Sequence, residues 1–259
     1  MRTIFSFENE FVTVEEILIK KIPCLKFKPK GIQEERLPTI LYYHGWHSGK
    51  VYQRFKGTVL ASYGYQVIVP DAIYHGERDP IDHDDPNMLE AYFWKVILQN
   101  VQESEQLIAG IIEEHQGDPR RMAVIGSSMG GFSASGIFVQ NKNLKCLINF
   151  NGSCAWVKAE EIFRRKSKRL SMTPEEMQEL SPYDPMLNKE NLQLRPILML
   201  HGNRDSSVPI NSQRLFYQSA SYHYKECPER LRLVEIQNMD HYISTGMMEE
   251  AIIWLKKYL

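Results

Sequence analysis

Residues 121–132 read RMAVIGSSMGGF: an apolar run stops at a glycine, presents a serine and continues through two more glycines. The stretch contains G-x-S-x-G, which is typical of a strand that turns sharply into a helix and holds the serine in strained backbone geometry. Only very small side chains fit two residues on either side of such a serine, and Gly126 and Gly130 occupy those positions. The stretch predicts a nucleophilic Ser128, with a glycine-rich turn without chemistry as the alternative.

On both sides of this stretch, short apolar runs alternate with helical spacing of apolar residues. Apolar runs at residues 38–43, 65–69, 144–150, 196–200 and 231–237 predict buried strands, as does the run before Gly126. Helices are expected at residues 52–63, about 86–115, 132–140 and 210–221, and at the C-terminus, where Met248, Ile252, Leu255 and Leu259 share one face. This alternation predicts an α/β fold: a mostly parallel sheet with helices on both faces.

Two segments depart from the alternation. Residues 3–8, 11–19 and 21–28 predict strands at an antiparallel N-terminal edge. Residues 151–195 have no strand signal but two helical patterns, one at about residues 155–165 and one that Thr173, Pro174 and Glu176 open as N-cap, first-turn proline and capping-box partner. We interpret residues 151–195 as a helical lid inserted into a single domain of residues 1–259.

The composition excludes several classes of partner. A net charge of -1 and a pI near 6.7 give no general attraction to nucleic acid or to an anionic membrane. The first ten residues contain acids where a signal peptide needs an apolar core, so a cytosolic protein is expected. The four cysteines show no C-x-x-C spacing, which favours reduced thiols over a disulfide framework or a zinc site.

A serine hydroxyl becomes a nucleophile when a neighbouring imidazole removes its proton. In this layout the base and the acid follow the serine in the sequence and lie at the ends of late strands. His241 lies in the loop between the last predicted strand and the last helix, so it is the expected base. His201, in a turn at the end of a strand, and His223, between a helix and a strand, are the rivals.

A carboxylate must orient the imidazole and stabilise its charged form. Asp205 follows the strand at residues 196–200 and is the expected acid. Asp240 is the main rival, although the side chain of a sequence neighbour is expected to point away from His241. Asp184 lies in the predicted lid, and Asp205 itself has a turn or helix-capping role as its alternative.

The oxyanion of a tetrahedral intermediate needs two aligned donors. The backbone N–H of Met129, directly after the serine, is one candidate. The loop after the strand at residues 38–43 reads HGW, and its glycine lets the chain pass close to the site, so the N–H of Trp46 is the other. The indole of Trp46 is equally explained by packing.

Taken together, these motifs resemble those of α/β-hydrolases over nearly the whole chain: HGW at 44–46, DAIYHGER at 71–78, GSSMGG at 126–131, HGNRD at 201–205 followed by Val208-Pro209, and Asp240-His241. Within that superfamily the chain is similar to small bacterial carboxylesterases on the prolyl-oligopeptidase and dienelactone-hydrolase side. The resemblance implies ester hydrolysis without a cofactor, with Ser128, Asp205 and His241 as the triad. It also implies that residues 71–78 support the active-site loops, with His75 and Arg78 in structural roles.

Three further features are open to a functional interpretation. Trp156, Phe163 and Met172 are candidates for an acyl-binding pocket, and packing of the lid explains them equally well. The basic run from Arg164 to Arg169 is interpreted as a solvated face, with attraction of an anionic substrate such as an acyl-CoA as the alternative. The histidines and aspartates at 75 and 83–85 fit no metal-ligand spacing, so no metal is expected.

The sequence thus predicts a serine carboxylesterase that acts on small-molecule, short-chain esters without a cofactor. An acyl thioesterase and a small peptidase are the alternatives within enzymes, because the same triad serves all three reactions. A catalytically inactive binding protein of the same fold is the alternative from another class.

Overall fold

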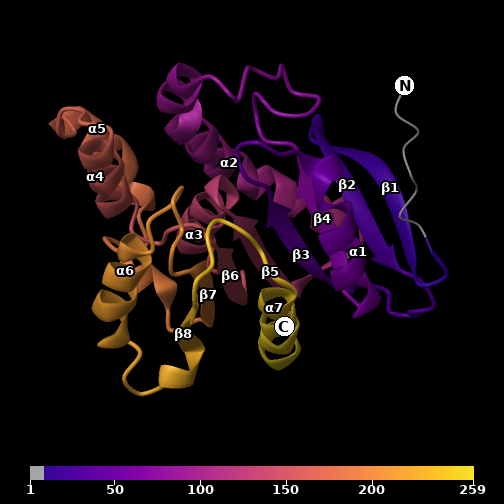
Figure 1. The fold of residues 1–259 in the computed structure, drawn as a ribbon. Helices are drawn as coiled ribbons and strands as arrows, with labels where there is room; N and C mark the ends of the chain where they lie inside the picture. Colours follow the sequence, from indigo (N-terminus) through magenta and orange to yellow (C-terminus); the bar gives the residue numbers. More distant parts are fainter. Residues whose placement is uncertain (1–8) are drawn as a thin grey trace.

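In this computed structural model, eight strands of the described residues, 9–259, form one sheet (Figure 1). The strand expected at residues 3–8 lies outside the described residues. The strand order is β1-β2-β4-β3-β5-β6-β7-β8, and β2 is antiparallel to β1 and β4 while all other neighbours are parallel. The predicted parallel sheet with an antiparallel N-terminal edge is therefore confirmed. The strands are β1 (Val12–Ile19), β2 (Ile22–Pro29), β3 (Leu37–Tyr43), β4 (Gln66–Pro70), β5 (Gly117–Ser127), β6 (Cys146–Phe150), β7 (Ile197–Gly202) and β8 (Leu231–Ile236).

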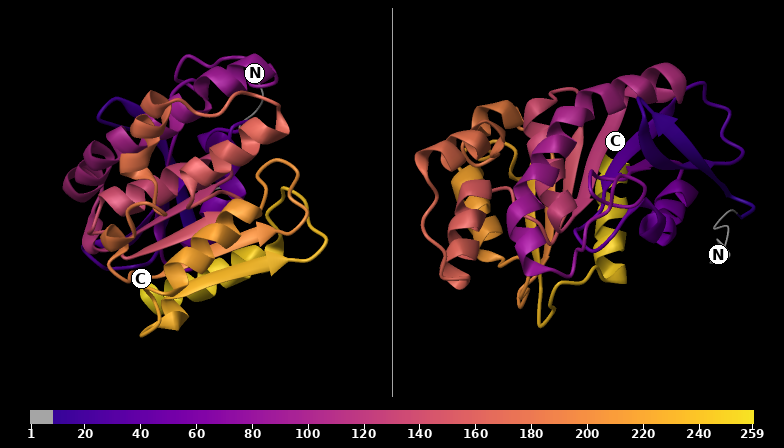
Figure 2. Two further views of the ribbon diagram at one scale, coloured as in Figure 1. Left: turned by 90° about the vertical axis from the view of Figure 1, so that its left-hand side faces the viewer. Right: turned by 90° about the horizontal axis from the view of Figure 1, so that it is seen from above.

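Helices cover both faces of the sheet and lie beyond its end (Figure 2). They are α1 (Arg54–Ser62), α2 (Pro86–Glu114), α3 (Met129–Gln140), α4 (Trp156–Lys166), α5 (Pro174–Leu180), α6 (Asn211–Ser221) and α7 (Thr245–Tyr258), with short 3-10 turns η1 (Lys50–Gln53), η2 (Ser181–Tyr183), η3 (Lys189–Leu192) and η4 (Pro228–Arg230). Within residues 9–259, none of these helices combines the length and the apolar character needed to cross a membrane.

The two cores follow the period-2 alternation of the central strands. On β3, Tyr42 belongs to the core that α1 and α7 cover, whereas Tyr43 belongs to the core that α2 and α3 cover. Both faces of the strand are buried, which explains why its sequence reads as an uninterrupted apolar run. The loops at the carboxyl ends of β3, β5, β7 and β8 consequently meet at one edge of the sheet, between the two helical layers.

The helix expected at residues 52–63 is present as η1 and α1, and only some of its apolar side chains face the core. Phe55 is 66% exposed and Tyr63 is 49% exposed, while Leu60 is fully buried. The helix approaches the sheet at Gly57, where an added Cβ would lie 2.5 Å from the ring of Phe27. A small residue, and not an aromatic one, therefore marks the buried face of this helix.

Residues 151–195 contain two α-helices, α4 and α5, as expected, and they lie with α6 at the end of the molecule opposite β1 (Figure 1). The predicted capping box is present: Thr173 Oγ1 accepts from the N–H of Glu176 at 3.2 Å, and Glu176 Oε2 accepts from the N–H of Thr173 at 2.8 Å. Asp184 is buried and accepts the N–H of Val157 at 2.9 Å, so it fixes the start of α4.

The segment at residues 71–78 is held by a buried carboxylate. Asp71 accepts the N–H and the ammonium of Lys50 at 2.8 and 3.2 Å, and the N–H of Glu77 at 3.2 Å. Gly76 has a φ of +56°, and a Cβ on it would lie 2.2 Å from Asp71 Oδ2, so only glycine fits. Arg78 forms a two-pronged ion pair with Glu103 at 2.8 and 2.6 Å. These contacts tie the segment to η1 and α2.

Candidate active site

Three side chains meet at the carboxyl edge of the sheet. Ser128 follows β5, Asp205 follows β7 and His241 follows β8. His241 Nε2 lies 2.8 Å from Ser128 Oγ, and His241 Nδ1 lies 2.7 Å from Asp205 Oδ2. A carboxylate can only accept, so Nδ1 carries the proton and Nε2 is free to accept the hydroxyl proton of Ser128. The geometry is that of a nucleophile, a base and an orienting acid.

The turn between β5 and α3 holds Ser128 in a strained conformation. Its φ and ψ are 56° and -124°, outside the regions that a residue with a side chain normally adopts. A Cβ on Gly126 would lie 1.9 Å from the carbonyl oxygen of Gly130, and a Cβ on Gly130 would lie 2.2 Å from the carbonyl oxygen of Tyr43. Close approach of backbone to backbone is therefore the physical reason for both glycines.

Asp205 is a buried carboxylate with every neighbour donating to it. The N–H groups of Ser207 and Val208 reach Oδ1 at 2.9 and 2.8 Å, and His201 Nε2 lies 3.2 Å from Oδ2. Burial alone raises the pKa of Asp205, but the hydrogen bonds from His201 and His241 outweigh it and hold that pKa well below its usual range. Asp205 is thus ionised at neutral pH and faces the imidazole of His241 as a full negative charge.

The rival acids and bases have other contacts. Asp240 Oδ1 accepts the N–H groups of Ser206 and His241 at 2.7 and 2.8 Å, so its carboxylate points away from the imidazole. Asp184 caps α4, as described above. His201 is fully buried behind Asp205, and its Nε2 also lies 2.8 Å from the carbonyl oxygen of Val208. His223 is exposed, and its ring lies edge-to-face with that of Tyr222.

The two chain segments that contain the candidate oxyanion donors adjoin Ser128. Met129 is the first residue of α3, and the first four N–H groups of a helix have no partner within it. The loop after β3 passes close by, because a Cβ on Gly45 would lie 3.2 Å from Ser128 Cβ. Within residues 9–259, no hydrogen bond uses the N–H of Trp46. Trp46 follows β3 and Met129 follows β5, so both remain candidates for the oxyanion donors.

The ring of His75 holds the loop that contains Trp46. His75 Nε2 lies 2.8 Å from the carbonyl oxygen of Trp46, and Nδ1 lies 2.8 Å from that of Ile73. The indole of Trp46 donates to the carbonyl oxygen of His83 at 3.0 Å. The neutral ring carries one N–H, so it donates to one of the two carbonyls; this bond and that of the indole fix the loop, which agrees with a structural role for His75.

Acidification is expected to destabilise the fold through His75. Burial lowers the pKa of His75 to about 4, below the value of about 6.5 in an unfolded chain. Between these two pH values the unfolded state binds more protons, so stability rises with pH and is lost as pH falls. We expect the free energy of unfolding, measured in urea, to fall by about 2 kcal/mol between pH 7 and pH 5 through this group.

His75→Gln retains an N–H donor for Trp46 without the titrating ring, so it should reduce that difference between pH 7 and pH 5. His223→Gln, at an exposed ring, is the control. An unchanged pH dependence in His75→Gln would contradict the assignment.

A cavity of about 910 Å³ opens above Ser128 and His241. Its apolar wall includes Leu89, Phe93 and Trp94 from α2, Phe163 from α4, and Val208. Residues 86, 89, 90, 93 and 94 all line it, which is the spacing of one face of a helix. Leu89 and Phe93 were not assigned to the site from the sequence. The helical spacing of these residues along α2 could have indicated that this face of the helix borders the site.

The structure separates the two lid aromatics predicted to bind substrate. Phe163 lines the cavity and packs near Phe93 and Phe132. Trp156 does not line it: its side chain is fully buried, and its indole donates to Ser135 Oγ at 3.0 Å. The prediction of Trp156 as a substrate-binding residue is therefore corrected to packing. The reason is that α4 begins in the core and ends over the cavity.

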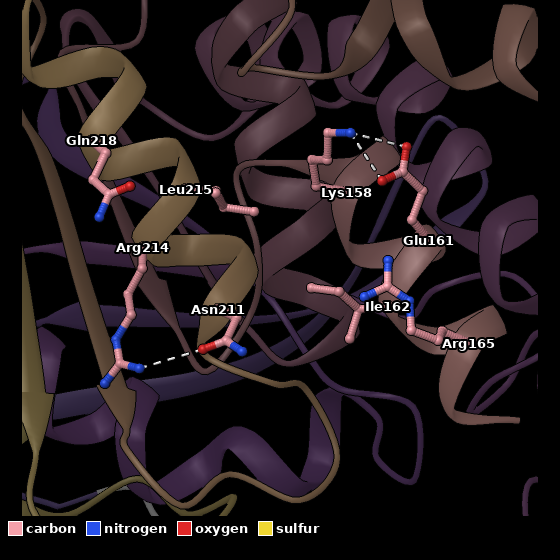
Figure 3. A pocket seen from close by; sticks show the side chains of 8 residues that line it. All are labelled: Lys158, Glu161, Ile162, Arg165, Asn211, Arg214, Leu215 and Gln218. Carbon is pink, nitrogen blue, oxygen red and sulfur yellow. Dashed lines mark hydrogen bonds and ion pairs between the residues drawn. The ribbon is translucent and has the colours of Figure 1, made fainter.

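The opposite face of α4 borders a second, smaller hollow of about 370 Å³, which it forms with α6 (Figure 3). Lys158 and Glu161 of α4 pair with each other at 2.9 Å, and Arg214 of α6 bonds Asn211 at 3.3 Å. The two hollows share no lining residue, and no serine, cysteine or histidine lines this one. It is separate from the triad.

The basic run at the end of α4 is divided: Arg164 and Arg169 form ion pairs, whereas Arg165, Lys166 and Lys168 are exposed, as expected for a solvated face. Arg164 bonds Glu160 and Glu176 at 2.6 and 2.7 Å. Arg169 lies 3.3 Å from Glu90 and 3.5 Å from Glu160. Glu160 lies on α4 itself, four residues before Arg164, whereas Glu90 and Glu176 join this segment to α2 and α5.

Comparison with known proteins agrees with this geometry. Residues 99–257 match the model of the prolyl oligopeptidase family. YitV from Bacillus subtilis (strain 168), provisionally named an esterase, is 29% identical over 96% of this chain and 100% of its own length. Esterase YjfP from Escherichia coli (strain K12) is 28% identical over 96% of this chain and 100% of its own length.

A solved structure shows the same fold. TT1662 from Thermus thermophilus superposes with a TM-score of 0.78 at 21% identity, covering 95% of this chain and 97% of that one. The predicted resemblance to α/β-hydrolases on the prolyl-oligopeptidase side is confirmed by the family match, which spans more than half of the sequence. The chain belongs to the prolyl oligopeptidase family.

Proposed function

We propose that this protein is a serine carboxylesterase that hydrolyses short-chain, small-molecule esters through an acyl-enzyme intermediate. The single observation that supports it most is the continuous relay from Ser128 Oγ through His241 to the ionised Asp205, open to a cavity of about 910 Å³. The esterase names of two relatives that align over their full length agree with this activity.

In the proposed acylation step, Ser128 Oγ attacks the ester carbonyl carbon while His241 Nε2 takes the hydroxyl proton. The negative charge of Asp205 stabilises the imidazolium that forms, and its bond to Nδ1 keeps the ring aligned. The N–H groups of Trp46 and Met129 hold the oxyanion, and each such donor contributes about 2.7–4 kcal/mol to barrier lowering.

Collapse of the tetrahedral intermediate breaks the bond to the alcohol, which leaves with the proton from His241 Nε2. A water molecule then attacks the acyl-enzyme, with His241 again as the base and later as the acid toward Ser128. The second half-reaction thus uses the same three side chains, and each proton returns to its starting atom.

Residues 151–195 are proposed to act as a lid that sets which acyl groups reach Ser128. Phe163 and Phe93 form an apolar surface in the cavity, with ring centroids 6.1 Å apart. A short aliphatic or aromatic acyl group would bury apolar area there. We keep a cytosolic location and a single domain with this insertion as parts of the proposal.

The test is a panel of 4-nitrophenyl acetate, butyrate and octanoate, an acyl-CoA thioester and an aminoacyl peptide, measured as kcat/KM with the purified protein. The highest value is expected on the short esters. Higher values on the thioester or on the peptide would replace the ester assignment. A fluorophosphonate probe is expected to label the wild-type protein at Ser128; absence of labelling together with absence of turnover would favour an inactive binding protein.

A further inference from the structure

One half-buried lysine in the active-site cavity has no carboxylate partner. Lys56, on α1, lines the same cavity as Ser128 and His241. Its ammonium donates to Oε1 of Gln53 at 2.7 Å and lies 6.0 Å from the ring centroid of Tyr42. Within residues 9–259 it has no ion pair. A positive charge therefore faces the cavity, and the ammonium has N–H groups that are not used in the bond to Gln53.

The neutral partner of Lys56 is itself fixed. Gln53 is buried, and its amide nitrogen donates to Ser48 Oγ at 2.7 Å and to the carbonyl oxygen of Gly49 at 3.3 Å. A carbonyl oxygen can only accept, so Oε1 of Gln53 is the atom that faces the lysine. Gln53 therefore directs the ammonium without neutralising it.

Of the other cations that line the cavity, Arg169 has carboxylate partners, and Lys166 lacks one but is exposed to solvent, unlike Lys56. Arg169 is paired with Glu90 and Glu160, and the ammonium of Lys166 donates to the carbonyl oxygen of Ser206 at 2.5 Å. Burial without a compensating anion lowers the pKa of Lys56, which is the electrostatic cost of an uncompensated charge. An anion brought by a ligand would remove that cost.

Lys56 and the aromatic wall lie on opposite sides of the sheet. Tyr42, beneath Lys56, belongs to the core under α1 and α7, whereas Phe93 and Phe163 pack against the core under α2 and α3. Ser128 follows β5, the neighbour of β3 at the centre of the sheet. The cavity thus has a cationic side and an apolar side, with the nucleophile at the strand edge that divides them.

We propose that Lys56 binds a carboxylate on the substrate, so that the preferred esters are monoanionic, with the carboxylate on one side of the scissile bond and an apolar group on the other. This inference rests on the proposed esterase function. The carboxylate would accept from the free N–H groups of Lys56, a charge-assisted bond that is roughly twice as strong as a neutral one.

Two matched substrate pairs test it, because the members of each pair differ only in whether the carboxylate is free or methylated. In 4-nitrophenyl hydrogen glutarate and 4-nitrophenyl methyl glutarate the carboxylate or its methyl ester is on the acyl side. In 3-acetoxybenzoate and methyl 3-acetoxybenzoate it is on the alcohol side. For each pair, the measured quantity is the ratio of kcat/KM for the anion to kcat/KM for the neutral ester.

In at least one pair Lys56→Met is expected to lower that ratio by about 10-fold or more, as loss of a charge-assisted bond predicts. Lys56→Gln should give the same drop and provides a second neutral variant, while Lys56→Arg should retain most of the ratio. Lys142→Met, at an exposed lysine outside the cavity, is the matched control. Fluorophosphonate labelling shows that each variant has a formed site.

Ratios that stay within about 2-fold of wild type for both neutral variants in both pairs would overturn the role of Lys56 while leaving the esterase intact. Wild-type protein that hydrolyses none of the four compounds in a Ser128-dependent way would overturn the proposed function and this inference with it. The two failures are therefore distinguishable.

Discussion

Ser128→Ala is expected to lower kcat on 4-nitrophenyl butyrate by about 10⁵–10⁶-fold, since removal of the nucleophile of a serine triad leaves only binding and oxyanion stabilisation. The variant should fold normally. Ser128 is the N-cap of α3 but makes no side-chain capping bond, so its hydroxyl contributes little to the helix. The small alanine side chain also keeps the same strain at φ 56°, which the glycines on either side already accommodate.

The measurement is steady-state hydrolysis together with thermal unfolding and fluorophosphonate labelling. Ser127→Ala is the matched control, because Ser127 is the preceding residue and lines the cavity without a hydrogen bond to His241. The kcat of Ser127→Ala should fall by less than about 10-fold, as expected for a change that leaves the triad in place. Activity that survived in Ser128→Ala at the wild-type rate would refute the nucleophile assignment.

The sequence specified the central sheet well because both signals for it are local. Uninterrupted apolar runs belong to strands buried on two faces, and the glycines around Ser128 mark contacts of backbone with backbone. Chain order then placed Asp205 and His241 at later strand ends. Each of these inferences depends on spacing within a few residues or on topology. None of them requires knowledge of which side chains from distant segments contact one another.

The cavity was less predictable because it is made by side chains distant in the sequence. Trp156 and Phe163 lie seven residues apart on α4, so periodicity places them on one face, yet depth along the helix separates core from cavity. The same limitation hid Phe93 and Lys56. It also hid Glu176 of α5 as a partner of Arg164, because a charge run shows its sign but not its partners on other helices.

Asp205 and Asp240 were hard to separate from sequence for the opposite reason: proximity along the chain is a poor guide to side-chain direction. Asp240 adjoins His241, but its carboxylate accepts backbone N–H groups and the hydroxyl of Ser206. Asp205 lies 36 residues away and reaches the imidazole at 2.7 Å. Substitution of Asp205 is therefore expected to have a far larger effect on activity than the same substitution of Asp240.

Asp205→Asn is expected to reduce kcat by about 10⁴-fold, and Asp240→Asn by less than about 10-fold. In Asp205→Asn a neutral amide, which both donates and accepts hydrogen bonds, replaces a carboxylate that only accepts them. The amide nitrogen can donate to Nδ1 of His241, which moves the ring proton to Nε2 and removes the lone pair that accepts the proton of Ser128. In Asp240→Asn the Oδ1 acceptor for the N–H groups of Ser206 and His241 is retained.

Unfolding curves as a function of pH separate this catalytic effect from a structural one. The pKa of Asp205 is depressed in the folded state, so its stabilisation is complete above the unfolded value of about 3.9 and is lost as pH falls below it. Asp205→Asn should therefore have a lower free energy of unfolding than wild type at pH 7, and the difference should be smaller at low pH. Its reaction with the fluorophosphonate probe should still be far slower than that of the wild type. If Asp240→Asn instead lost the activity and Asp205→Asn kept it, Asp240 would be the acid that orients His241. The bond between His241 Nδ1 and Asp205 would then be only a structural contact.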